Sequence, residues 1–174
     1  MNYLKFFFII LICFSFTQSY LRSDVPHFVD FKFILNESKA GKSAQDFLKK
    51  KLNDGIKNLQ KKEKSIQEEE KKIIKQKKVI SAEEYKKKVT ELRSKVSSLQ
   101  KERNELLDSI AKQRAKARRE LLKNLNPIMS DYMKANKIRM IVDKKSILLA
   151  DETLNLTKEI TALLDKKLKS IKLN

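Results

Sequence analysis

The chain has 174 residues and a formal net charge of +18, with 40 lysines and arginines against 22 aspartates and glutamates. It contains only two glycines, two prolines and one histidine, which favours long helices and excludes both a multi-histidine metal site and a histidine-based triad. The excess positive charge favours acidic partners, anionic membrane surfaces or nucleic acid.

The N-terminus has the pattern of an export signal. One lysine within residues 1–5 precedes the apolar run 6–16, which only Ser15 interrupts. This run has the length of a signal-peptide core and is shorter than the roughly 20 residues of a membrane-spanning helix. Small residues at Thr17 and Ser19 predict cleavage after Ser19, so residues 1–19 form the signal and the mature chain carries a net charge of +17.

Cys13 is the only cysteine and lies inside the predicted signal. A lipoprotein cysteine is the alternative, but Ile12 is bulky where a lipobox has a small residue. The mature chain then has no thiol, which suits an oxidising compartment and allows no disulfide.

A coiled-coil pattern extends from about Ser43 to Leu125. Its first half has a column of residues seven apart: Leu52, Leu59, Ile66, Ile73 and Ile80. Its second half alternates by four and three through Tyr85, Val89, Leu92, Val96, Leu99, Arg103, Leu106, Ile110, Gln113 and Ala117. This is the heptad spacing of two packed helices, and two of its positions are polar. Residues 43–125 are therefore predicted to form an arm.

A capping box separates the two halves. Ser81 can accept a hydrogen bond at the start of a new helix while Glu84 reaches back to its amide. The pattern predicts a helical hairpin with its turn near 79–82 and arms of about 55 Å at 1.5 Å per residue. One continuous helix through Ser81 is the alternative.

The seam of the first arm helix is uneven. Four residues after successive column members come Ile56, Glu63, Glu70 and Lys77, so only the root has an apolar partner and the tip should be loosely packed. Residues 39–123 also hold 27 basic and 13 acidic residues, a net charge of +14. Ion pairs on a solvated coiled coil would account for part of this charge, but not for the excess of one sign.

The flanking segments have strand character. Residues 27–31 lead into Phe33–Leu35, and residues 137–142 and 146–150 surround Asp143–Lys145, which predicts a β-hairpin. Both faces of these strands are apolar and need cover.

Pro127 should end or kink the second arm helix and leave a short helix over residues 128–134. A last amphipathic helix should begin near Thr157, capped by Asn155, and extend to Ile171. Residues 20–42 and 126–174 together form a small α+β body of marginal size, for which homo-oligomerisation is the natural remedy.

Chemistry-bearing motifs are few, so neither an enzyme nor a cofactor is expected. His27 is interpreted as a strand-edge residue, and Glu68–Glu70 point in different directions on a helix. Gly41–Ser43 lacks the preceding glycine of a phosphate-binding loop. The basic arms lack zinc ligands, and Tyr85 is the only aromatic between Leu48 and Pro127, so specific nucleic-acid binding is not expected.

In order and spacing, several segments resemble the Skp/OmpH family of periplasmic chaperones over essentially the whole mature chain. Residues 28–30 and 34–42 are similar to the family's opening strand and the start of its first long helix. Residues 81–85 resemble the start of its returning helix, and residues 138–143, 147–150 and 156–164 its closing hairpin and last helix. Asn155 departs from the family's usual aspartate, although both residues cap helices well.

The resemblance implies a mainly α fold with a small β-sheet body, and a homotrimer whose helical-hairpin arms enclose a cavity. It implies an ATP-independent holding chaperone of the periplasm whose partners are unfolded outer-membrane proteins. Anionic lipid or lipopolysaccharide is a further expected partner. A structural coiled-coil envelope protein and a non-specific polyanion-binding or nucleic-acid-binding protein stay as alternatives.

Two groups of residues are predicted to carry this function. Candidates for body and subunit contacts, with core packing as the alternative, are Phe28, Val29, Ile138, Met140, Ile141, Val142, Ile147 and Leu149. Candidates for diffuse attraction of clients or anionic surfaces, with a solvated surface as the alternative, are Lys71, Lys72, Lys86, Lys87, Arg114, Arg118 and Arg119. We expect the basic group to act collectively.

Overall fold

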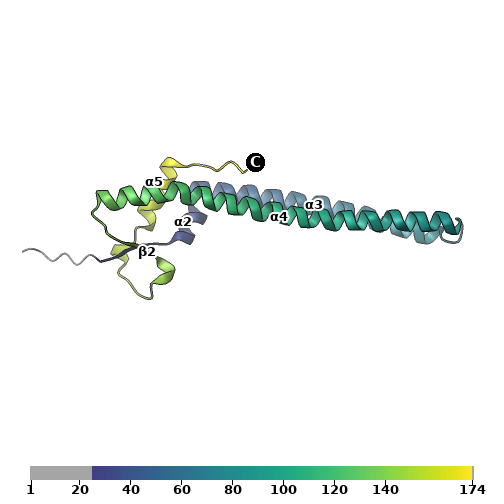
Figure 1. The fold of residues 1–174 in the computed structure, drawn as a ribbon, viewed down its shortest axis with the longest axis horizontal. Coiled ribbons are helices and arrows are strands. Elements are labelled where there is room, and N and C mark those ends of the chain that lie inside the picture. Colours follow the sequence, from purple (N-terminus) through teal and green to yellow (C-terminus); the bar gives the residue numbers. More distant parts are fainter. Residues whose placement is uncertain (1–24, 174) are drawn as a thin grey trace, which may run out of the picture.

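A computed structural model describes residues 25–173 of the chain. Figure 1 shows a long two-helix arm that projects from a small body containing the remaining elements. The predicted signal peptide and Cys13 lie outside the described residues.

The body begins with strand β1 (His27–Val29) and the short helix α2 (Phe31–Glu37). Between them, the carboxylate of Asp30 accepts a hydrogen bond from the Phe33 amide at 2.8 Å and starts the helix. The strand character predicted for residues 33–35 was therefore wrong. Three consecutive apolar residues have no periodicity of their own, and the capping aspartate directs them into a helix.

The first arm helix, α3 (Lys39–Gln76), begins earlier than the heptad pattern predicted. Ser38 has extended backbone, and its hydroxyl accepts a hydrogen bond from the Gly41 amide at 3.2 Å. The amide of Lys39 donates to the Asp165 carboxylate at 2.7 Å. At Gly41 a Cβ would overlap the carbonyl oxygen of Leu35, so only glycine permits this close passage. Capping and body contacts, rather than the coiled-coil seam, determine where α3 begins.

The arm reverses direction at its tip, which confirms the predicted hairpin. Helix α3 ends at Gln76, and α4 (Ala82–Ala135) begins after Ser81, whose hydroxyl accepts a hydrogen bond from the Glu84 amide at 3.1 Å. One continuous helix through Ser81 is thereby excluded. With 54 residues, α4 extends about 80 Å at 1.5 Å per residue.

Helix α4 continues through Pro127, so the predicted helix end with a separate short helix over residues 128–134 was wrong. A proline inside a helix loses one backbone hydrogen bond and costs about 3 kcal/mol. Buried residues on both sides of it, Leu121, Leu125 and Ile128, pack into the body core. This packing offsets the cost and keeps the helix continuous.

The C-terminal end of α4 is closed by a left-handed residue. Lys137 has φ of 56°, and the Ile138 amide donates to the Met133 carbonyl at 2.9 Å. This is the geometry of a Schellman motif, in which glycine usually takes the left-handed position. The chain leaves the helix here and turns toward the sheet.

Strand β2 (Ile141–Asp143) pairs with β1 in a parallel, two-stranded sheet. The predicted hairpin was wrong, because the Asp143 carboxylate accepts from the Lys145 amide at 3.2 Å and starts the 3-10 turn η1 (Lys144–Ser146). Within the described part of the chain, residues 147–150 form no strand. The second edge of β1 is used instead by Leu156, whose amide donates to the Phe28 carbonyl at 2.9 Å.

The last helix, α5 (Thr157–Lys167), follows the 3-10 turn η2 (Glu152–Leu154). The N-cap of α5 is Leu156, which makes no side-chain capping bond, so the cap predicted at Asn155 was wrong by one position. The Asn155 side chain accepts from the amide of Thr157 at 3.1 Å and from its hydroxyl at 2.6 Å. The helix ends before the predicted Ile171, because Leu168 adopts an extended conformation. We call Leu168–Leu173 the tail.

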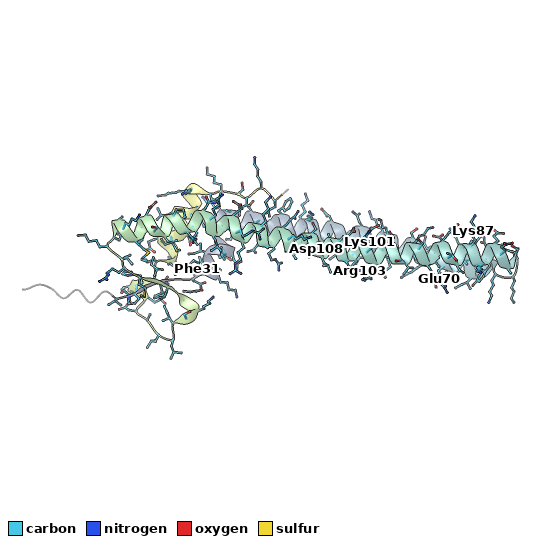
Figure 2. The ribbon with its side chains drawn as sticks, viewed as in Figure 1. Phe31, Glu70, Lys87, Lys101, Arg103 and Asp108 are labelled. Atoms are coloured by element: carbon cyan, nitrogen blue, oxygen red, sulfur yellow. The ribbon has the colours of Figure 1, made fainter. Side chains whose placement is uncertain are left out.

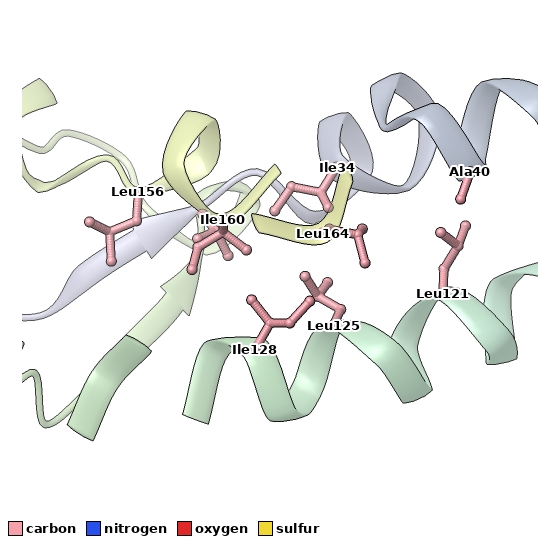
Figure 3. Packing of buried hydrophobic residues seen from close by; sticks show 9 residues of the cluster. Ile34, Ala40, Leu121, Leu125, Ile128, Leu156, Ile160 and Leu164 are labelled. Atoms are coloured by element: carbon pink, nitrogen blue, oxygen red, sulfur yellow. The ribbon is translucent and has the colours of Figure 1, made fainter. Parts of the chain in front are cut away.

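The body core is small and draws on every long element. Figure 3 shows apolar side chains from α2, α3, α4 and α5 packed between the helices and the sheet. Its buried members are Val29, Ile34, Ala40, Leu121, Leu125, Ile128, Leu156, Ile160 and Leu164. Because α3 and α4 both enter this core, the body holds the root of the arm in place.

Candidate binding surfaces of the arm and the body

The root of the arm is its best-packed part. Ala44 and Leu48 of α3 face Ile110 and Ala117 of α4, and each of these residues is buried. We call these four residues the root seam. Ile110 and Ala117 were predicted seam positions, whereas Ala44 and Leu48 lie outside the predicted column. Ile56, the apolar partner that the pattern placed at the root, is 40% exposed.

Beyond the root seam, apolar packing becomes sparse. We call residues 56–107 the distal arm. Leu59 and Ile73 of α3 are buried, whereas α4 has no buried residue between Ala82 and Ser109. Val96, a predicted seam position, is 51% exposed. The distal arm is therefore loosely packed, as the sequence predicted.

Ion pairs between the two helices replace apolar contacts in the distal arm. Lys62 pairs with Glu102, and Lys95 with Glu69, each at 2.6 Å. Glu63 takes a position where the heptad pattern would have an apolar residue, and its carboxylate lies 3.7 Å from the Arg103 guanidinium. Figure 2 shows the polar side chains projecting around the arm. Exposed pairs of this kind contribute about 0–1 kcal/mol each, so they align the helices without holding them firmly.

A shallow apolar pocket of about 440 Å³ lies between the helices near the tip. Its apolar lining consists of Ile73, Ile74, Tyr85, Val89, Leu92 and Val96. Ile74 is 59% exposed, and Lys77 lies 5.8 Å from the centroid of the Tyr85 ring. The distal arm thus presents apolar and basic groups side by side to solvent.

The seven basic candidates are all exposed, and none forms an ion pair within residues 25–173. The structure does not bring them into one cluster. Lys71, Lys72, Lys86 and Lys87 lie on the distal arm. Arg114, Arg118 and Arg119 lie on α4 near the body. Any attraction they exert is spread along the arm, as a collective role requires.

The eight body candidates divide into core and surface. Phe28 and Val29 are buried in this chain. Partly buried positions are Ile138, Ile141, Val142 and Ile147, whereas Met140 and Leu149 are exposed. Only the last two therefore present most of their apolar surface for contact with another molecule.

Sequence reasoning missed the most exposed apolar residue of the body. Leu148 and its neighbour Leu149 are 103% and 92% exposed, so both side chains point away from their own chain. The predicted hairpin would have placed them on opposite faces of a strand. Without the hairpin, they form one exposed apolar pair.

The sequence also gave no indication of a groove where α4 ends. This cavity of about 810 Å³ is lined by Met129, Met133 and Ile138, with Lys134, Lys137 and Arg139 among its polar neighbours. Its walls come from the last turns of α4 and the segment that follows the left-handed Lys137.

Among residues 25–173, no group of three or more histidine, cysteine, aspartate or glutamate side chains could hold a metal ion. Within the same residues, no helix combines the length and the apolar character needed to cross a membrane.

The family model described as outer membrane protein (OmpH-like) matches residues 27–164. No curated protein matches the chain. Among solved structures, a candidate outer membrane chaperone (OmpH-like) from Caulobacter crescentus CB15 matches with a TM-score of 0.80. The two sequences are 19% identical, and the match covers 85% of this chain and 89% of that one, which shows a shared fold. Because the family match includes the whole arm and most of the body, the chain belongs to the OmpH-like family.

Proposed function

We propose that this protein is an ATP-independent holding chaperone that binds unfolded outer-membrane proteins in the periplasm before their insertion. The observation that carries the proposal is the composition of the distal arm surface. The distal arm is basic and sparsely packed, and it exposes several apolar side chains to solvent. Ile74, Val79, Val96 and Leu107 are each more than half exposed.

Unfolded outer-membrane barrels present alternating apolar residues that aggregate in water. Scattered weak contacts with the arm would hold such a chain without imposing a structure on it. A net charge of +14 over residues 39–123 would attract acidic clients across about 8–10 Å at physiological salt. Release would then follow from the client's own folding or from its transfer to the membrane.

A homotrimer is the assembly we propose. Its support is the small body core together with the exposed pair Leu148 and Leu149 and the half-exposed Met140. A second copy that covered these side chains would supply apolar burial that a body of this size lacks. In such a trimer the three bodies would pack together, and the three arms would enclose a space for a client.

Light scattering tests the holding function. A urea-unfolded outer-membrane barrel is diluted into buffer with and without the purified protein. The buffer contains about 0.15 M salt, at which the Debye length is about 8 Å. We expect suppression at about one oligomer per client. A structural coiled-coil protein would leave the scattering unchanged, and that result from folded, oligomeric protein would refute the proposal.

A matched pair of variants locates the activity on the arm. Ile74→Ser with Val96→Ser removes exposed apolar surface, and we expect it to weaken suppression. Ser94→Ala with Ser98→Ala alters exposed polar positions of the same arm and should leave suppression intact. A polycation acting through charge alone would instead bind duplex DNA and clients alike, with an affinity that falls steeply as salt rises.

A further inference from the structure

The tail does not end at the body but returns to the arm. Figure 1 shows it leaving α5 and following the root of the arm. Leu173 is 2% exposed and belongs to the same apolar cluster as the root seam. Ile171 packs against this cluster and against the body core.

The tail occupies the root seam with a period of two. Ile171 and Leu173 face the cluster, and Lys172 between them is exposed. This is the alternation of an extended strand with one apolar face. The strands of outer-membrane barrels carry the same alternation.

The tail is held by its side chains alone. Within residues 25–173, no backbone hydrogen bond joins residues 169–173 to the rest of the chain, and the Leu168 amide, donating to Leu164 at 2.7 Å, makes the last one. An occupant attached in this way can leave without breaking a sheet or a helix.

The tail adds positive charge to an arm that is already basic. Lys169 and Lys172 are exposed and form no ion pair with any described residue, while the exposed Arg114 lies one helical turn from Ile110. The arm as a whole carries a net charge of +14 over residues 39–123. A neutral or acidic segment with the same apolar spacing would avoid this repulsion.

We propose that the root seam is a binding groove for an extended, alternating apolar segment of an unfolded barrel, and that the tail closes this groove until such a segment displaces it. The inference rests on the proposed holding function and adds a site to it. The tail then acts as an internal competitor that keeps the root seam from water and from self-association when no client is present.

The first test releases the tail in the intact protein. The probe is a fluorescein-labelled synthetic peptide of about ten residues, the length of a transmembrane β-strand, in which leucine alternates with serine or aspartate. A groove that is closed nine-tenths of the time binds about ten-fold more weakly than an open one. We therefore expect Ile171→Asp with Leu173→Asp to bind the probe about ten-fold more tightly than the unaltered protein.

Two controls give the result its meaning. Ser170→Ala alters an exposed, uncharged residue of the same tail and should leave the affinity unchanged. A peptide of identical composition with its leucines grouped in pairs should bind more weakly to the double variant. Equal affinity of the double variant and the unaltered protein, with both folded and oligomeric, would overturn the proposal.

A second measurement decides the question if the double variant does not fold. Lys172→Cys, in a chain whose Cys13 is replaced by serine, is labelled with a nitroxide spin label and titrated with an unfolded outer-membrane barrel. Displacement of the tail should increase the mobility of the label in the electron paramagnetic resonance spectrum as binding saturates. Suppression of aggregation with no change in label mobility refutes the tail proposal alone, whereas absence of suppression refutes the holding function beneath it.

Discussion

The two arm helices approach so closely at Gly55 that a Cβ there would lie 2.5 Å from Cδ2 of Leu106. The glycine receives the leucine side chain from the opposite helix. This contact marks the boundary between the apolar root and the distal arm with its ion pairs.

A leucine at position 55 should reverse the sign of the stability change that Leu106→Ala causes. Gly55→Leu adds helix propensity of almost 1 kcal/mol, but overpacking at the seam costs about 1–3 kcal/mol. Leu106→Ala alone should destabilise the arm, whereas in the Gly55→Leu background it should stabilise it. Urea unfolding followed by helical circular dichroism measures both effects. Lys57→Leu, at an exposed position of α3, is the control background in which Leu106→Ala keeps its original cost.

Lys137 offers a stabilising substitution. Because its φ of 56° is unfavourable for any residue with a Cβ, Lys137→Gly should raise the free energy of unfolding by about 0.5–1 kcal/mol. The matched control, Lys134→Gly, lies within the last turns of α4 and should lose about 1 kcal/mol. Thermal unfolding of both variants at one protein concentration compares them, and a loss of stability in both would contradict the Schellman geometry.

The turn before α5 should respond to acid. The Thr153 backbone amide and hydroxyl both donate to the Asp151 carboxylate at 2.9 Å and hold its pKa below the ordinary value of 3.8. The folded state thus favours the ionised form, so the stabilisation is present above pH 3.8 and is lost as pH falls through the lower, folded pKa.

Carbon-detected NMR of the Asp151 carboxyl measures this titration. Thr153→Val removes the hydroxyl donor and keeps the amide, so the midpoint should rise part of the way toward 3.8. Thr161→Val, whose hydroxyl bonds instead to the Thr157 carbonyl, should leave the midpoint unchanged. A midpoint at or above 3.8 in the unaltered protein would refute the assignment.

Substitutions of a core and of surface apolar residues of the body should separate folding from assembly. Ile160 is fully buried, so Ile160→Ala should cost about 2–5 kcal/mol of folding free energy. Leu148→Asp with Leu149→Asp changes side chains that contact nothing in their own chain, so helical content should persist. If the proposed homotrimer forms through these leucines, sedimentation velocity over a range of concentrations should show it dissociating in the aspartate variant. An unchanged oligomer would remove this pair from the interface.

The arm could be predicted from the sequence because its information is local. Heptad spacing identifies which faces meet, and Ser81 marks the turn by a hydrogen bond to a residue three positions away. The exposure of the basic residues could be predicted in the same way, because burying a charged side chain costs free energy on any helix. Loose distal packing could be predicted from the residues that follow each column member.

The body was predicted less well because distant residues decide its structure. Whether Pro127 ends a helix depends on core packing on both sides of it, and no local rule contains that packing. The second edge of β1 is used by Leu156, so the segment after η1 finds no free strand edge among residues 25–173. The exposure of Leu148 and Leu149 and the packing of Leu173 against the arm both depend on such contacts between residues far apart in the sequence.

The unbroken course of α4 makes the body core a determinant of arm direction. Leu121, Leu125 and Ile128 belong to the same helix as the residues of the tip, about 60 Å away at 1.5 Å per residue. A rotation of a few degrees at Leu125 therefore displaces the tip by several ångströms. In the proposed trimer, substitutions in the body core would thus change the spacing of the three arm tips without altering any residue that a client would touch.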